Sequence, residues 1–358
     1  MGKSVHFMVL LVLFVCSCTS GRDGMIESDG IMFVRDWEFD NPLVADVGFE
    51  CDEIGVRGIR VLDSVMILSN DKNWGIFTID CKRKLGEMFS IGQGPGEFVM
   101  FIPQSNYCGY VTENDSLVVY APDLMKSKIV RANIDNLVAG ITPVAEEVMD
   151  IPPFSAPTLD VVPIDSVSYF LLAFNDERTA VSRLVSIGDS IYVIPGTERF
   201  NGMCVKDAQK SNLLGHQTLF NAKHRKIVEG FYSLNRIHLY GLDSGDALTI
   251  CVGDKLDSVE EIEQLEERMF PKRYSVLAQC DNCFGAICPV VGDKDNGNYG
   301  KSDLQVFDWD GRPIYRTVFP FQIDVFGFDL RNGRLIVHDE YEDMVLAYDA
   351  TPIIERLE

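Results

Sequence analysis

The chain has 358 residues, in which 54 acidic residues outnumber 32 Lys and Arg residues and give a formal net charge of −22 at pH 7. This charge excludes nucleic acid as the expected partner, because the chain offers no basic stripe that could neutralise phosphates. With 46% hydrophobic and 24% charged residues, the composition excludes a disordered chain and indicates a globular protein.

The N-terminus predicts an export signal. Lys3 precedes an apolar run from Phe7 to Val15, which is shorter than the roughly 20 residues that a transmembrane helix needs. A basic start, a short apolar stretch and small residues at its end are typical of a secretory signal peptide. We therefore assign residues 1–17 to a signal peptide and expect the protein to be exported.

A cysteine stands where cleavage of this signal is expected. The sequence Val15-Cys16-Ser17-Cys18 resembles the bacterial lipobox, which implies cleavage before Cys18 and acylation of its thiol and its new amino group. Two or three acyl chains are enough for stable anchoring. The alternative is an ordinary cleaved signal followed by a spare cysteine. We expect an outer-membrane lipoprotein that faces the periplasm or the cell surface and contacts the membrane through its N-terminal lipid.

A hairpin unit recurs along the rest of the chain. Residues 18–30 are mostly polar and predict a flexible tether, and the repeats that follow predict one domain over residues 31–358. Each copy has a strand, a tight polar turn and a second strand, and most turns lie about 50 residues apart. The six copies occupy residues 59–68, 109–120, 161–172, 227–240, 274–288 and 325–338.

The repeat predicts the architecture. A second hairpin follows most copies, for example at residues 183–188 and 304–311, so each unit holds four strands, the content of one propeller blade. We predict an all-β, six-bladed β-propeller of four-stranded antiparallel blades, because a closed ring protects the sheet edges. Residues 31–37 are expected to complete a blade with C-terminal residues.

Two stretches depart from the strand pattern. Residues 196–224 predict a polar loop that lies outside the strands. Residues 257–269 predict one short helix on a rim of the ring, because Ser258 suits its N-terminus and Val259, Ile262 and Leu265 share one face.

A glycine-rich phrase follows the first predicted blade. It runs Ser90-Ile-Gly-Gln-Gly-Pro-Gly-Glu-Phe98, and its candidate channel-mouth residues are Gly92, Gly94, Pro95, Gly96 and Glu97. The glycines permit positive φ or a close backbone approach, so we expect a crossing between blades near the central channel. Two interpretations remain open, a loop that contacts a ligand and a required turn in which Glu97 caps backbone amides.

The same phrase resembles the signature of TolB-like six-bladed propeller lipoproteins of Bacteroidetes, which are similar to NHL-repeat propellers. Segments 274–289, 304–315 and 324–339 resemble further parts of that family, although Cys283 and Cys288 depart from its usual residues. The resemblance runs from the lipobox to the C-terminus. It implies the propeller fold and says little about activity.

No catalytic, cofactor or metal site is predicted. Cys280 and Cys283 flank a hairpin turn, which lacks the helix N-terminus of a redox CxxC and the second ligand pair of a zinc site. We interpret them as strand-end cysteines, with a cross-turn disulfide as the alternative, and expect mostly free, buried thiols in the chain. The loop from Asp293 to Gly300 fails the EF-hand order. His338 is expected to be a hydrogen-bonded structural residue.

Asp-Ser before an aliphatic residue recurs in the predicted turns. It resembles the O-glycosylation acceptor of exported proteins from the same bacterial group, and the alternative is ordinary turn chemistry. The candidate acceptors are Ser64, Ser116, Ser166, Ser190 and Ser258.

The predicted function is that of a binding or scaffold module at the cell envelope, with a protein, peptide or glycan as ligand. The alternative is a propeller enzyme, a lyase or a hydrolase acting on an extracytoplasmic glycan or peptide. Ionisable side chains that converge at the channel mouth with perturbed pKa values would distinguish the two functions.

Overall fold

The computed structural model describes residues 25–37, 40–62, 64–94, 96–99, 102–141, 145–151, 158–290 and 300–358, to which all structural statements below refer. Cys18, Pro95 and most of the loop from Asp293 to Gly300 lie outside these residues. Within the described part of the chain, no helix is both long and apolar enough to cross a membrane.

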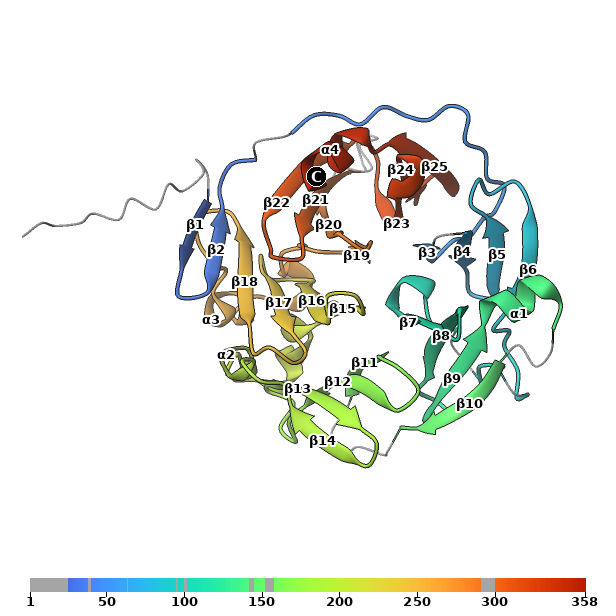
Figure 1. Cartoon of the computed structure of the whole chain (residues 1–358). Helices are drawn as coiled ribbons and strands as arrows, with labels where there is room; N and C mark the ends of the chain where they lie inside the picture. The colour runs from blue at the N-terminus through green and yellow to red at the C-terminus, as the bar shows by residue number, and fades with distance from the viewer. Residues whose placement is uncertain are drawn as a thin grey trace, which may run out of the picture.

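Six sheets stand around a common axis (Figure 1), which confirms the predicted all-β six-bladed propeller. Blade 1 consists of β3 (Gly58–Val61), β4 (Val65–Ser69), β5 (Trp74–Thr78) and β6 (Lys84–Met88). Blade 2 consists of β7 (Gly109–Glu113), β8 (Ser116–Asp123), β9 (Lys128–Asn133) and β10 (Ala145–Asp150). Blade 3 consists of β11 (Thr158–Pro163), β12 (Ser168–Phe174), β13 (Val181–Ile187) and β14 (Ser190–Val193). Blade 4 consists of β15 (His216–Asn221), β16 (Lys226–Phe231), β17 (Ile237–Gly241) and β18 (Ala247–Val252). Blade 5 consists of β19 (Val276–Gln279), β20 (Cys283–Val290), β21 (Lys301–Asp308) and β22 (Pro313–Phe319). Blade 6 consists of β23 (Ile323–Asp329), β24 (Arg334–Asp339) and β25 (Met344–Asp349).

The first strand of each blade lies nearest the axis, and each later strand pairs with the one before it. Burial explains the sequence pattern of the strands. Every residue of the second strand β4 and of the third strand β17 is buried, because each blade packs between two others and both of its faces need apolar side chains. By contrast, every residue of the outer strand β14 is exposed.

Blade 4 corrects the predicted repeat. The hairpin at residues 227–240 forms the second and third strands of this blade, and its inner strand is β15. That strand lies inside the predicted loop at residues 196–224, which is therefore wrong in part. Its sequence, His-Gln-Thr-Leu-Phe-Asn, is largely polar, so the hydrophobic pattern did not reveal it. The corresponding turn of this blade therefore lies at residues 222–225, between β15 and β16, which accounts for part of the irregular spacing between the predicted turns.

The N-terminal hairpin extends blade 4. Strands β1 (Met25–Ser28) and β2 (Ile31–Val34) pair with each other, and β2 runs parallel to β18. The expectation that residues 31–37 complete a blade with the C-terminal residues is therefore wrong. Strand β1 also lies inside the predicted tether, residues 18–30, so the propeller begins earlier than predicted.

A shorter N-terminal segment, residues 43–46, completes the last blade. The amide of Asp46 donates to Ala347 O and the amide of Asp349 donates to Val44 O, both at 2.8 Å. Leu43 packs into the core of blades 5 and 6, and Asp46 pairs with Arg334 at 3.1 Å. Residues that precede the first blade thus occupy the place of a fourth strand beside β25, which protects its edge.

The helices are short. They are α1 (Ile134–Ala139), α2 (Glu198–Asn201), α3 (Val259–Glu263) and α4 (Thr351–Leu357), with 3-10 turns η1 (Ser105–Tyr107), η2 (Ala208–Leu214), η3 (Glu267–Met269) and η5 (Leu330–Asn332). Helix α3 lies in the predicted stretch 257–269, and the hydroxyl of Ser258 accepts from the amide of Glu261 at 3.2 Å. It ends before Leu265, which is 39% exposed. The prediction of a single helix did not anticipate the other three.

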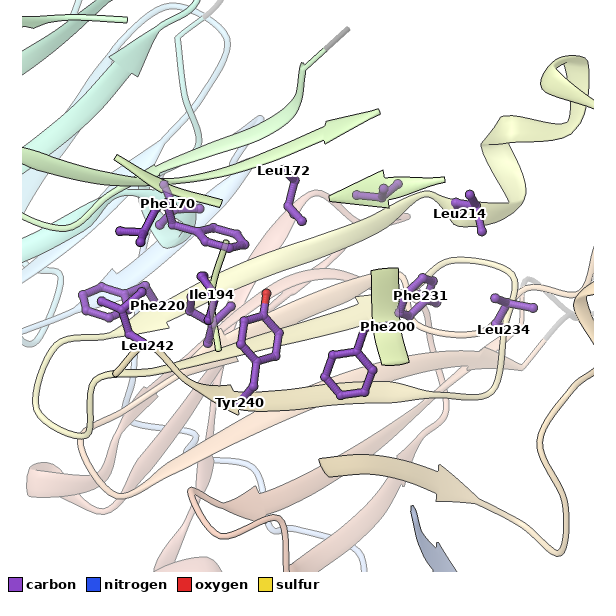
Figure 2. Packing of buried hydrophobic residues seen from close by; sticks show 14 of the residues in the cluster. Phe170, Leu172, Ile194, Phe200, Leu214, Phe220, Phe231, Leu234, Tyr240 and Leu242 are labelled. Carbon is purple, nitrogen blue, oxygen red and sulfur yellow. The ribbon is translucent and has the colours of Figure 1, made fainter. Parts of the chain in front are cut away.

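The largest apolar cluster lies between blades 3 and 4 (Figure 2). Phe170 of β12 and Tyr240 of β17 belong to facing blades and have ring centroids 6.3 Å apart, and Phe200 of α2 packs against Tyr240 at 5.8 Å. An ion pair lies inside this contact. Arg183 Nη2 donates to Glu229 Oε2 at 2.6 Å, and both side chains are at most 1% exposed. Burial opposes ionisation of Glu229, but Arg183 holds its pKa well below the usual range.

The cysteines only partly follow the expectation of free, buried thiols. Cys51 and Cys81 form a disulfide between the segment before β3 and the turn after β5. Six described cysteines are free, and three of them, Cys108, Cys251 and Cys283, are buried.

Candidate functional site: a cavity beside the channel plug

The connection between blades 1 and 2 crosses the axis of the ring. Its 3-10 turn η1 contacts β3, β15 and β19, which belong to blades 1, 4 and 5, and we call residues 102–108 the channel plug. The amide of Ser105 donates to Ser69 Oγ at 3.0 Å, and Trp74 Nε1 donates to Pro103 O at 2.7 Å. A Cβ on Gly58 would lie 2.8 Å from the Ser105 nitrogen, so only glycine permits this approach.

Polar side chains join the inner strands along the channel. Gln279 Nε2 donates to Phe220 O at 2.8 Å and Arg60 Nη1 to Gln279 O at 3.1 Å. Asn106 of the plug donates to Leu277 O at 3.3 Å. Inner strands are sheet edges with unpaired backbone groups, so these side chains satisfy polar groups that the sheets leave free.

A cavity of about 520 Å³ lies beside the plug, in the range of small-ligand sites. It opens at the end of the ring where the inner strands begin, because the starts of β11 and β15 line it. The described lining residues are Pro103, Gln104, Tyr107, Pro122, Asp123, Leu124, Met125, Leu159, Asp160, Val161, His216, Gln217, Thr218 and Tyr232. None of these described residues is Lys or Arg.

Asp160 is the most unusual group of the cavity. Burial raises its pKa from 3.8 to about 6, and the negative charge of Glu229 adds to this. The hydroxyl of Thr218 and the amide of Val161 act in the opposite direction. No ion pair of Asp160 occurs among the described residues, and a carboxylate held without a counter-charge in a cleft is a functional-site signal.

Two phenol rings flank this carboxylate. Burial raises the pKa values of Tyr107 and Tyr232, and the charge of Asp160 raises both further. Both rings therefore remain neutral at physiological pH. Tyr232 is 42% exposed at the rim of the cavity, whereas Tyr107 comes from the plug. Asp123 adds a second carboxylate, whose buried Oδ2 has no hydrogen-bond partner among the described residues.

His216 links the cavity to the buried ion pair between blades 3 and 4. Its Nδ1 donates to Leu214 O at 2.7 Å, and its Nε2 lies 3.9 Å from Glu229 Oε2. Burial lowers the pKa of His216. The Nδ1 bond and packing against the Phe231 ring, with ring centroids 4.9 Å apart, hold His216 in place, whereas its Nε2 has no hydrogen-bond partner among the described residues.

The predicted glycine loop lies in the same connection as the plug but outside the cavity lining. Glu97 Oε2 accepts from the amide of Gly94 at 2.7 Å, and the Lys126 ammonium donates to Glu97 O at 2.7 Å. Gly92 leaves room for the Glu97 carboxylate, and Gly96 has a φ of +76°. This geometry is that of a turn stabilised by Glu97. The loop holds the β8–β9 turn, whose Leu124 and Met125 line the cavity.

The other predicted residues lie elsewhere. Ser64 and Ser166 lie in turns at the far end of the ring from the cavity, and Ser116 and Ser190 begin β8 and β14 at the same end. Ser258 lies at the start of α3. His338 contacts Asp324 and Asp343 at 2.6 and 2.9 Å in blade 6. Among the described residues, no group of three or more His, Cys, Asp or Glu is arranged to hold a metal ion.

Sequence reasoning missed Asp160. The sequence does hold one indication of this site. Asp160 is the single carboxylate in the apolar stretch Leu159-Asp160-Val161-Val162, and one side of an inner propeller strand faces the axis, so such a carboxylate is a candidate for a site at the channel. Tyr107 and Tyr232 lie in connections, where the hydrophobic pattern gives no information about what they face.

Comparisons with known proteins give only distant similarities. No family model matches the sequence, and no curated protein matches it. A DUF4221 family member from Bacteroides vulgatus is 12% identical, with a TM-score of 0.48 over 86% of this chain and 94% of its own. Regucalcin, a calcium-binding protein from Agrobacterium tumefaciens, is 11% identical, with a TM-score of 0.45 over 87% and 95%. The Cps50 (Swd1) propeller domain of Myceliophteria thermophila is 10% identical, with a TM-score of 0.44 over 87% and 100%.

Proposed function

We propose that this protein is an exported binding module whose cavity beside the plug takes a cationic group, namely a Lys or Arg side chain of a peptide. The observation that carries the proposal is Asp160, a half-buried carboxylate without an ion-pair partner among the described residues, whose pKa is raised to about 6. A cation in the cavity would replace the counter-charge that the carboxylate lacks.

The surroundings of Asp160 suit a cation. Tyr107 and Tyr232 offer neutral aromatic rings, which attract ammonium and guanidinium groups through their faces. Leu124, Met125 and Leu159 can cover the apolar stem of a long basic side chain. The net charge of −22 also steers cationic ligands toward the protein and disfavours anionic ones.

Calorimetric titration with blocked tripeptides tests the proposal. The probes carry lysine, arginine, glutamine or glutamate at the central position, and we expect binding of the first two only. Asp160→Asn should weaken lysine-peptide binding by at least about 30-fold, the loss typical of removing one partner of a buried charge pair. Asp176→Asn, an exposed Asp on the same end of the ring and outside the cavity, should bind like the parent protein.

The pH dependence is a second prediction. Asp160 is ionised above its pKa of about 6, so cation binding should be strongest at pH 7 to 8. Below pH 6, affinity should fall by about tenfold per pH unit as the carboxylate takes up a proton. Equal affinity for glutamine and lysine peptides, or affinity that does not change between pH 5 and 7.5, would contradict the proposal.

A propeller enzyme is the second candidate. Asp160 favours it, because a carboxyl with a pKa of about 6 can act as a general acid or base near neutral pH. His216 favours the binding function, because its Nδ1 is bonded to Leu214 O and no hydrogen bond or ion pair joins it to Asp160 among the described residues. Chemical change of a bound peptide or glycan, abolished by Asp160→Asn, would establish the enzyme instead.

Anchoring through Cys18 belongs to the same proposal. The lipobox-like sequence at residues 15–18 supports it, and a lipid would hold the propeller at the envelope. Metabolic labelling with a clickable fatty acid should mark the parent protein and leave the Cys18→Ala variant unlabelled. Release of the parent protein into the soluble fraction would count against the anchor.

A further inference from the structure

Two cysteines lie at the end of the ring opposite the cavity. Cys280 follows the inner strand β19, Cys283 begins β20, and residues 281 and 282 form the turn between them. The amide of Cys280 donates to Cys283 O at 2.8 Å. The two residues are therefore directly opposite each other at the mouth of a tight hairpin.

Their sulfur atoms are in contact. Cys280 Sγ lies 2.7 Å from Cys283 Sγ. Hydrogen-bonded antiparallel partners have Cα atoms about 5.5 Å apart, which falls within the range that a disulfide spans. A bond between the two sulfurs therefore needs no backbone movement.

Contacts from blade 4 and from the rest of blade 5 hold the turn in place. Asn221 Nδ2 and Trp309 Nε1 both donate to Cys280 O, at 3.1 and 3.2 Å. The His224 ring bonds to Asp281 O at 2.8 Å through Nε2. These contacts come from blades 4 and 5, and they fix the turn before any reaction occurs.

The two thiols differ in environment. Cys280 is half-buried, whereas Cys283 is fully buried. The amide of Cys283 donates to Cys280 Sγ at 3.1 Å. Burial opposes a thiolate at Cys280, but bonds from Cys283 and from the amide of Asn282, with the charge of Arg60, bring its pKa below the usual value. Burial holds the pKa of Cys283 well above it.

Other free cysteines lack this environment. Burial raises the pKa values of Cys251 and Cys288 to about 11 in each case, and that of Cys108 well above its usual value. A thiolate with a neighbouring thiol is the arrangement that thiol–disulfide exchange requires, and among these residues only the Cys280–Cys283 pair provides it.

We propose that Cys280 and Cys283 form a thiol–disulfide exchange site, whose substrates are low-molecular-weight or protein disulfides. The Cys280 thiolate attacks one sulfur of the substrate disulfide, forms a mixed disulfide and releases the other sulfur as a thiolate, which takes up a proton. Cys283 then loses its proton and attacks Cys280 Sγ, which releases the second substrate thiol. The protein pair is oxidised by two electrons, and the substrate is reduced to two thiols.

Redox titration of the purified full-length protein tests the proposal. The protein is equilibrated with mixtures of reduced and oxidised glutathione, quenched with acid, alkylated and mapped by mass spectrometry. We expect Cys280 and Cys283 to change together from two alkylated thiols to one disulfide, and to return when reduced glutathione is restored. Cys283→Ser should accumulate glutathione on Cys280, because the resolving thiol is missing.

Alkylation rates separate the proposed nucleophile from an ordinary thiol. At pH 7, Cys280 should react with iodoacetamide at least about tenfold faster than Cys288. Arg60→Gln should slow this reaction several-fold, and Arg60→Lys should restore it in part. Cys288→Ser is the matched control and should leave the redox transition unchanged.

Three results would each overturn the proposal. They are a Cys280–Cys283 bond that glutathione cannot reduce, two cysteines that remain thiols in oxidised glutathione, and a Cys280 that reacts no faster than Cys288. The first result would establish a structural disulfide, and the second a pair of inert strand-end cysteines.

Discussion

Glu229 and Arg183 form an ion pair enclosed between blades 3 and 4, so loss of either charge should be costly. Glu229→Gln leaves the guanidinium unpaired in a site where both side chains are at most 1% exposed. We expect a loss of about 3–5 kcal/mol in the free energy of unfolding, measured by urea denaturation. The double variant Glu229→Gln/Arg183→Gln should lose less free energy of unfolding than the two single variants lose in sum.

An exposed ion pair provides the control for Glu229. Arg268 and Glu266 are 2.6 Å apart, but their side chains are 80% and 69% exposed. Glu266→Gln should therefore change stability by less than about 1 kcal/mol. If Glu266→Gln and Glu229→Gln lowered the free energy of unfolding by similar amounts, burial would not be what makes the Glu229 ion pair important for stability.

Asp160 should reduce stability in the absence of a ligand. Its pKa rises on folding from 3.8 to about 6, so the unfolded chain loses its proton first as pH increases. The resulting penalty grows between about pH 4 and 6 and stays constant above that range. Asp160→Asn should stabilise the protein by up to about 2–3 kcal/mol at pH 8 and have little effect at pH 4.

Thermal melts of Asp160→Asn at pH 4 and pH 8, compared with the parent protein, measure this difference. An equal shift at both pH values would contradict the raised pKa. The combination of higher stability with lost peptide binding would also show that the lost binding does not come from unfolding.

At the residue scale, the sequence predicts which residues form a turn better than it predicts which distant residues contact one another. Glu97 and the glycines around it could be placed in a turn, because glycine spacing reports backbone geometry. Asp160, Tyr107 and Tyr232 could not be brought together, because they belong to three blades or connections. Their meeting depends on ring closure and on the plug, which local sequence patterns do not encode.

At the element scale, strands with an apolar run could be predicted and polar inner strands could not. The pattern found β4 and β17, which are buried throughout. It missed β15, because one side of this strand faces the channel and carries polar residues. It also misplaced β2, since pairing of β2 with β18 depends on which blade edge is free and not on the β2 sequence itself.

Truncation from the N-terminus tests these edge strands. A chain that begins after residue 34 loses the hairpin on blade 4, including Met32 and Val34, which are 8% and 0% exposed. We expect a loss of about 3–5 kcal/mol, the cost of two buried apolar side chains. A chain that begins after residue 47 also loses the segment beside β25.

The longer truncation should be more harmful. It leaves β25 as an exposed edge and removes the 3.1 Å pair between Asp46 and Arg334. Exposed edges promote pairing between chains, so light scattering should show aggregation that the shorter truncation lacks. Equal stability and solubility of the two chains would mean that residues 43–46 do not protect blade 6.

At the scale of the whole molecule, the two ends of the ring differ in chemistry. The cavity lies at the end where the inner strands begin. Ser64 and Ser166 lie in turns between first and second strands, and Ser116 directly follows such a turn. Ser190 directly follows the turn between the third and fourth strands of blade 3, so all four residues lie at the opposite end. Glycans at these turns would leave the cavity open.

Glycosylation should therefore follow the geometry of the ring. Ser64, Ser166 and Ser190 are exposed and Ser116 is half-buried, whereas the Ser258 hydroxyl already accepts from the Glu261 amide. In mature protein isolated from its natural source, we expect O-glycans on the first four residues and an unmodified Ser258. Intact mass and peptide mapping measure this. Glycans on Ser258 alone would point to sequence recognition without regard to structure, and an unmodified mass would leave the Asp-Ser pattern as turn chemistry.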